Sequence, residues 1–141
     1  MGKQKIVTAE GFRLVDENGK MRGALAIRKN GEPALGLYGK DGARRVIVAV
    51  RDDGNPAIGL FDKKGGERIK LMLGDGGAPS ARLNAKDGSA RVEIALDGHG
   101  DPSVTLMDKK GRSMARIMVS GDQKAALTFY DGDGKVKAHI A

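Results

Sequence analysis

The sequence has no cysteine and no tryptophan, and aromatic residues make up only 4% of it. The absence of cysteine excludes a disulfide framework and a thiolate metal site. The scarcity of aromatic residues predicts a core of small aliphatic side chains. No apolar run approaches the roughly 18 residues of a membrane-spanning helix, so we expect no membrane span.

Signals of targeting and catalysis are also missing. The first residues, MGKQKIVTAEGF, contain no apolar segment, so we expect no secretory signal peptide. The two histidines, His99 and His139, stand alone and are expected at the surface. The serines lie in no nucleophile motif, and the DGDG turn at 131–134 lacks the full calcium-loop pattern. We therefore expect no enzymatic activity, no cofactor and no metal.

The sequence is instead rich in glycine, with 22 residues, and in charge, with 25 Lys and Arg against 18 Asp and Glu. The glycines follow a period of 23 residues, which is also the spacing of all four prolines. The turn glycines of this period are Gly19, Gly42, Gly65, Gly88, Gly111 and Gly134. Such self-similarity predicts a repeat protein. We expect a lead-in over residues 1–10 and a single domain of six repeats over 11–141.

Each repeat contains two short segments in which apolar and polar residues alternate, separated by glycine-containing turns. Alternation with a period of two indicates a strand with one apolar face, and Asp-Gly or Lys-Gly between two such segments indicates a hairpin. The sequence therefore predicts an all-β fold. Six β-hairpins would form an antiparallel meander of twelve strands.

The apolar positions also predict a register. A four-residue loop at 39–42 pairs Leu35 with Val46, and we expect a type I turn with Gly42 in the left-handed region. A five-residue loop at 52–56 pairs Val48 with Leu60. Both loops keep the aliphatic residues on one face of the sheet.

Two other architectures fit the period. In a parallel β-solenoid, equal positions stack about 4.8 Å apart. That stacking would place the like charges of Arg22, Arg45, Arg68 and Arg91 in direct register, which is unfavourable. In a 12-strand barrel, the interior would be too wide for aliphatic side chains to fill.

An apolar face of this size must be covered, and we expect an obligate homo-oligomer, favouring a trimeric β-prism with a shared core. We expect Leu37, Val48, Leu60 and Leu71 to be buried, and Arg45 and Arg68 to be exposed. The predicted assembly core consists of Leu14, Leu25, Leu37, Val48, Leu60, Leu71, Leu83, Ile94, Leu106, Ile117, Phe129 and Ile140.

The repeat unit LxLYxKDGxxRVxVxVxxDGxP resembles hairpin repeats of uncharacterised bacterial proteins. In general design it is similar to the repetitive shafts of phage tail fibres and other trimeric β-fibres. The resemblance implies a structural role as a fibre, filament or spacer, and a place outside the cell or on a virion surface. Two alternatives remain: a module that binds nucleic acid or an anionic glycan through Arg22, Arg45, Arg68 and Arg91, and a barrel that carries an apolar ligand.

Overall fold

The computed structural model describes residues 7–141; residues 1–6, which belong to the predicted lead-in and to the segment assessed for a signal peptide, lie outside the described residues. The described chain is all-β, and its single short 3-10 helix lies in a turn. The strands are β1 (Gly11–Val15), β2 (Met21–Ile27), β3 (Pro33–Tyr38), β4 (Arg44–Val50), β5 (Pro56–Phe61), β6 (Glu67–Leu73), β7 (Pro79–Asn84), β8 (Ala90–Leu96), β9 (Pro102–Met107), β10 (Ser113–Val119), β11 (Ala125–Tyr130) and β12 (Val136–Ile140), with η1 (Asp75–Gly77) between β6 and β7.

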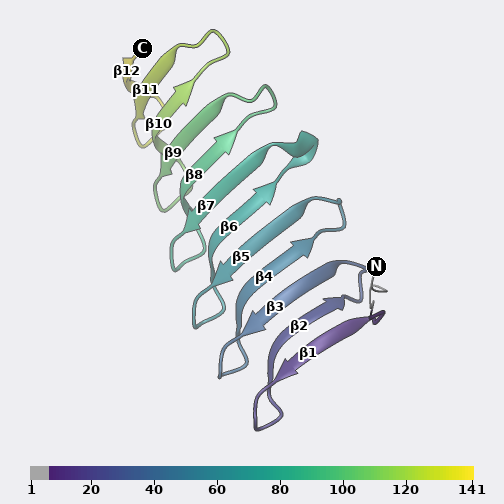
Figure 1. Cartoon of the computed structure of the whole chain (residues 1–141). Helices are drawn as coiled ribbons and strands as arrows, with labels where there is room; N and C mark the ends of the chain where they lie inside the picture. Colours follow the sequence, from purple (N-terminus) through teal and green to yellow (C-terminus); the bar gives the residue numbers. More distant parts are fainter. Residues whose placement is uncertain (1–6) are drawn as a thin grey trace, which may run out of the picture.

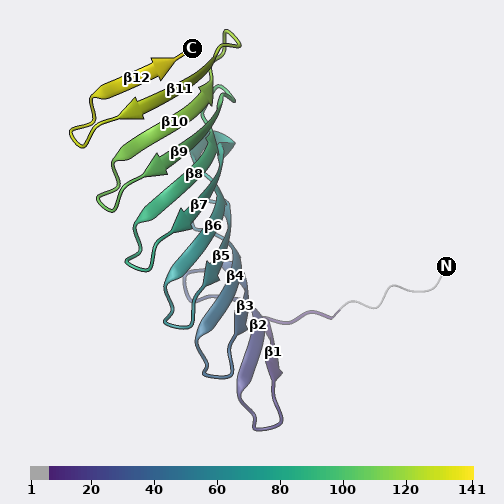
Figure 2. The same cartoon turned by 90° about the vertical axis from the view of Figure 1, so that its left-hand side faces the viewer.

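All twelve strands form one sheet in the order of the sequence, with every neighbouring pair antiparallel (Figure 1). The predicted antiparallel meander is confirmed, and the parallel solenoid is not what the chain forms. Strands β1 and β12 are the two free edges, so the sheet is open. Figure 2 shows the described residues as a twisted single layer, with no second layer on either face. Each strand contacts its two neighbours in the sequence and little else.

Consecutive strands are joined by turns of one kind. In the turn between β3 and β4, the amide of Gly39 donates to the carbonyl of Ala43 (2.8 Å), and the amide of Gly42 donates to the carbonyl of Gly39 (2.9 Å). Gly42 has a φ of 81°, as predicted from its position. This left-handed conformation costs glycine little and other residues more, which explains the glycine at the fourth place of nearly every turn.

The loop lengths and pairings predicted from the sequence are wrong by a small, regular amount. The loop between β3 and β4 has three residues between its closing pair, and Leu35 pairs with Val48 rather than Val46. A three-residue loop alone would set Leu37 opposite Arg45. The structure avoids this with a β-bulge: Tyr38 pairs with Arg44, Leu37 pairs with Val46, and Arg45 is the extra residue.

The next turn is also shorter than predicted. Arg51 and Asn55 close it, and Val48 consequently pairs with Ile58 instead of Leu60. Both errors shift the pairing by two residues. Because side chains alternate with a period of two, a shift of two leaves every residue on its predicted face.

The bulge recurs in the same hairpins along the whole sheet and sets its shape. It comes after the turn in the pairings β1–β2, β3–β4, β5–β6, β7–β8, β9–β10 and β11–β12, and the other described pairings have none. As a result Leu14 lies level with Leu37 and Leu60, the residues one and two periods later. The strands therefore carry no net stagger. Closing a sheet into a barrel requires such stagger, so this sheet extends straight at right angles to its strands.

Candidate assembly surface

One face of the sheet, here called the apolar face, consists of three straight rows of side chains. The first row holds Leu14, Gly23, Leu37, Val46, Leu60, Ile69, Leu83, Val92, Leu106, Ala115, Phe129 and Ala138; the second holds Phe12, Leu25, Leu35, Val48, Ile58, Leu71, Ala81, Ile94, Val104, Ile117, Leu127 and Ile140; the third holds Ile27, Pro33, Val50, Pro56, Leu73, Pro79, Leu96, Pro102, Val119 and Ala125. No residue in the three rows carries a charged or polar side chain.

All twelve residues of the predicted assembly core lie in the first two rows of the apolar face, and all are exposed in the single chain. The expectation that Leu37, Val48, Leu60 and Leu71 are buried is wrong for this chain by itself, since their exposed fractions are 41%, 39%, 37% and 43%. The physical reason is that the sheet is one layer thick. No segment within residues 7–141 packs on this face.

The third row was missed by the sequence interpretation. Its prolines were used only for their 23-residue spacing, whereas Pro56 pairs with Val50 and Pro79 pairs with Leu73. The available signal was the aliphatic residue that stands six places before each proline and ends the preceding strand. Above β5–β8 the rows form an open hollow of about 440 Å³, whose lining includes Ile58, Leu71 and Ile94.

The opposite face is mixed in character. It carries Gly36, Ala49, Gly59, Arg45, Lys70, Glu93, Thr105 and Arg116, as the alternation predicts. Arg82 and Glu93 form a cross-strand ion pair on it (2.5 Å). The apolar side chains that are buried among the described residues, Ala34 and Ala49, also lie here and pair with each other.

Glycine at position 59 has a specific cause. The ring of Phe61 folds back over it, and a Cβ atom at Gly59 would lie 2.9 Å from that ring. Arg44 in turn stacks on the outer side of the Phe61 ring, 5.1 Å from its centre. The residue types of this face therefore satisfy local packing within a single chain.

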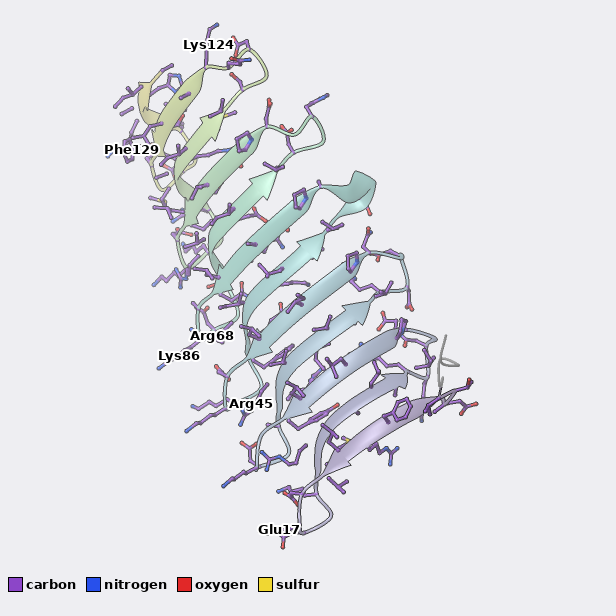
Figure 3. The ribbon with its side chains drawn as sticks, viewed as in Figure 1. Glu17, Arg45, Arg68, Lys86, Lys124 and Phe129 are labelled. Carbon is purple, nitrogen blue, oxygen red and sulfur yellow. The ribbon has the colours of Figure 1, made fainter. Side chains whose placement is uncertain are left out.

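The four arginines Arg22, Arg45, Arg68 and Arg91 occupy the same position in successive repeats. They lie along one side of the sheet, next to the turns, where Figure 3 labels Arg45 and Arg68. Each forms an ion pair with an aspartate of its own turn: Arg22 with Asp16 (3.5 Å), Arg45 with Asp41 (2.6 Å), Arg68 with Asp62 (3.9 Å) and Arg91 with Asp87 (3.4 Å).

Two of these arginines also connect neighbouring hairpins. Arg22 donates to the carbonyl of Tyr38 (3.3 Å), and Arg45 donates to the carbonyl of Asp62 (3.2 Å). The side chains of Arg45 and Arg68 are half-buried, with exposed fractions of 25% and 32%, so the expectation that they are exposed is wrong. Arg45 lies against the adjacent turn through its bond to Asp62, and Arg68 lies against Asp62 of its own turn. Arg22 and Arg45 thus link successive hairpins.

No protein-family model matches this sequence, and no curated protein is significantly similar to it. Within residues 7–141, no helix is long and apolar enough to cross a membrane. In the same residues, no three His, Cys, Asp or Glu side chains gather closely enough to hold a metal ion. His99 and His139 are both exposed, as predicted.

Several turn aspartates have a lowered pKa, Asp108 most clearly. The Asp108 carboxylate accepts hydrogen bonds from the Arg112 guanidinium (2.6 Å) and from the amides of Lys110 (2.8 Å) and Arg112 (3.0 Å). The Arg112 side chain first, and then these amides, lower the pKa of Asp108 from 3.8 to about 2. Amide donors likewise lower the pKa of Asp62 and Asp131. These carboxylates close the turns.

Proposed function

We propose that this protein is a non-enzymatic structural subunit that associates with copies of itself through the apolar face and acts as a segment of a β-fibre, a filament or a spacer. The observation that carries this proposal is the uninterrupted, uncharged surface of three rows. Twelve strands about 4.8 Å apart and about 20 Å long give this face an area of roughly 1,000 Å². The largest apolar patch of a typical monomer is about 300–600 Å².

The width of the sheet favours a trimer. Strands of six or seven residues are about 20 Å long, and three sheets of that width arranged as a triangular prism each lie about 6 Å from its axis. Packed sheets are about 10 Å apart, so each contributes a layer of about 5 Å. Leucine, valine and isoleucine side chains therefore fill the centre of a three-sided prism, whereas a four-sided one would be hollow.

The proposal is tested by placing a charge on each face of one strand. Leu71→Asp puts a carboxylate in the middle row of the apolar face, where assembly would bury it without a partner at a cost of several kcal/mol. Lys70→Asp puts the same group on the opposite face of β6, at a side chain that forms no ion pair within residues 7–141, and serves as the matched control. Light scattering measures the mass of each variant.

We expect the wild-type protein and the Lys70→Asp variant to have a mass about three times the 14.8 kDa of one chain, and the Leu71→Asp variant to be dissociated or unfolded. Wild-type protein that remains at 14.8 kDa at all concentrations would contradict the proposal. A mass of twice one chain would support self-association but contradict the three-sided prism.

Polyanion binding is the weaker candidate, because each of the four arginines already pairs with a carboxylate, and Arg22 and Arg45 also donate to carbonyls of the neighbouring hairpin. Binding to duplex DNA or heparin that weakens steeply with salt would support it. The hollow above β5–β8 belongs to the apolar face, and a second copy would cover it.

A further inference from the structure

The turns of the meander lie in two rows, one along each side of the sheet where the strands end (Figure 1). We call the seven-residue segments 16–22, 39–45, 62–68, 85–91, 108–114 and 131–137 the basic turn row, and the segments 28–34, 51–57, 74–80, 97–103 and 120–126 the acidic turn row. The basic turn row contains 15 Lys and Arg against nine Asp and Glu, a net charge of +6. The acidic turn row contains four against seven, a net charge of −3.

This difference in charge decides between two ways in which copies can meet. If they are related by an axis parallel to the strands, two basic turn rows lie side by side and repel each other. If the axis runs along the length of the sheet, the basic turn row of one copy lies beside the acidic turn row of the next. A three-sided prism with cyclic symmetry has the second arrangement at each of its three corners.

Resting on the proposed function, we infer that the copies associate in parallel and at the same level, with the basic turn row of each copy docked along the acidic turn row of its neighbour. The partner surface is therefore a second copy of this chain, recognised by the apolar face for affinity and by the turn rows for orientation. Complementary charge at a rim typically fixes register and partner choice.

The charges match best in the C-terminal half of the sheet. The turn of Asp97 and Asp101 carries a net charge of −2, and it lies level with the turns on either side of it in the order of the strands. Those turns, 85–91 and 108–114, carry net charges of +1 and +2. At the N-terminal end, 28–34 carries +1 beside +2 in 39–45, so the orientation is determined mainly beyond β4.

Charge reversal at turn residues that form no ion pair tests the inference. One variant changes Lys63, Lys64, Lys109 and Lys110 to Glu, and takes the basic turn row from +6 to −2. A second changes Asp52, Asp75 and Asp101 to Lys, and takes the acidic turn row from −3 to +3. None of the seven side chains forms an ion pair in the part of the chain that the structure describes, so each variant retains the contacts within its turns.

We expect each variant with one reversed row to assemble more weakly at low salt, because like charges then face each other. The concentration below which the oligomer dissociates should rise roughly tenfold or more. The variant with both rows reversed should assemble like the wild type, and roughly 1 M salt should remove the differences. Strengthened assembly after the lysine changes would show that basic rows face each other and overturn the inference. Unchanged assembly would overturn it as well, and either result would leave the proposed function standing. Wild-type protein at 14.8 kDa throughout would instead remove the proposed function.

Cross-linking gives a second measurement that is independent of affinity. Because the chain has no cysteine, Lys63→Cys and Asp52→Cys each introduce a unique thiol. When the two single-cysteine variants are mixed, a maleimide linker of roughly 10 Å should join them. In the inferred arrangement their turns belong to opposite rows and lie at adjacent levels. A mixture of Lys63→Cys and Lys86→Cys is the control, and efficient joining of that pair would show facing basic rows and overturn the inference.

Discussion

The basic and acidic turn rows share one type of turn but differ in the residues directly after it. Both rows close with the same two backbone hydrogen bonds, as in 62–66 and 51–55. Only the hairpins of the basic turn row then insert an extra residue, such as Arg68 between the pairs Phe61–Glu67 and Leu60–Ile69. The comparison shows that the turn reverses the chain, whereas the bulge sets the register. One bulge in each 23-residue repeat keeps the apolar face uniform from β1 to β12.

The largest expected effect separates the bulge from the regular ladder of the same hairpin. Deleting Arg68 removes the extra residue, and the remaining residues can pair as an unbulged ladder with Leu60 still opposite Ile69. Deleting Gly59 instead makes Ile58 and Leu60 adjacent, so one of them must turn to the opposite face. Misplacing aliphatic side chains costs about 1.5–3 kcal/mol each.

We expect the Gly59 deletion to abolish assembly, and the Arg68 deletion to retain the oligomer with a lower melting temperature. Light scattering and thermal denaturation of the two deletions make the comparison. Equal loss of assembly in both would mean that the bulge residue contributes more than register.

A smaller effect concerns the fourth position of the turns. Gln123 occupies it in the acidic turn row with a φ of 62°, where the equivalent Gly100 has a φ of 88°. A non-glycine residue in this conformation costs roughly 1–2 kcal/mol, partly offset by the lower entropy of the unfolded chain. Gln123→Gly should therefore stabilise the chain by about 0.5–1 kcal/mol in denaturant titrations.

Gly100→Gln is the converse variant and should destabilise by a similar amount. If both substitutions are neutral, the turns of the acidic row tolerate side chains at this position, and the abundance of glycine there has another cause.

The smallest effect is a dependence on pH in the basic turn row. Asp108 has a pKa of about 2 in the folded chain against an ordinary value of 3.8, so its charge stabilises the fold above about pH 4, and this contribution is lost as the pH falls toward 2. Asp108→Asn keeps the side-chain oxygen that accepts the turn amides and removes the charge beside Arg112. The variant should melt slightly below the wild type at about pH 6, and at the same temperature near pH 2. A difference that persists at the lower pH would assign the effect to the turn geometry.

The face of each aliphatic residue was predictable from alternation, and the conformation of Gly42 from its place in the turn. The bulge at Arg45 was not predicted, because a four-residue loop at 39–42 already keeps the aliphatic residues on one face. The odd period contained the missing signal. Two three-residue loops give an even repeat, so a period of 23 would move Leu37 and Leu60 to opposite faces unless one extra residue is inserted.

The sequence predicts which residues share the apolar face, but it does not predict how exposed they are in the single chain. Alternation shows that Val48 and Leu71 share a face, but burial depends on whether a layer lies above them, and no segment within residues 7–141 supplies one. The third row was missed because the prolines were used only for their 23-residue spacing, although the ring of Pro56 adds apolar surface beside Val50.

The straightness of the sheet has a mechanical consequence. The two ends of the described chain lie at opposite ends of its long axis, and the backbone hydrogen bonds of an antiparallel sheet lie along that same axis (Figure 1). A pull on the two ends of one chain therefore peels β1 from β2 and β12 from β11, breaking a few bonds at a time because no other element among the described residues shares the load. A single chain would unravel at low force. In the proposed fibre, tensile strength would come from the side chains interlocked between copies, and would grow with every hairpin added to the length.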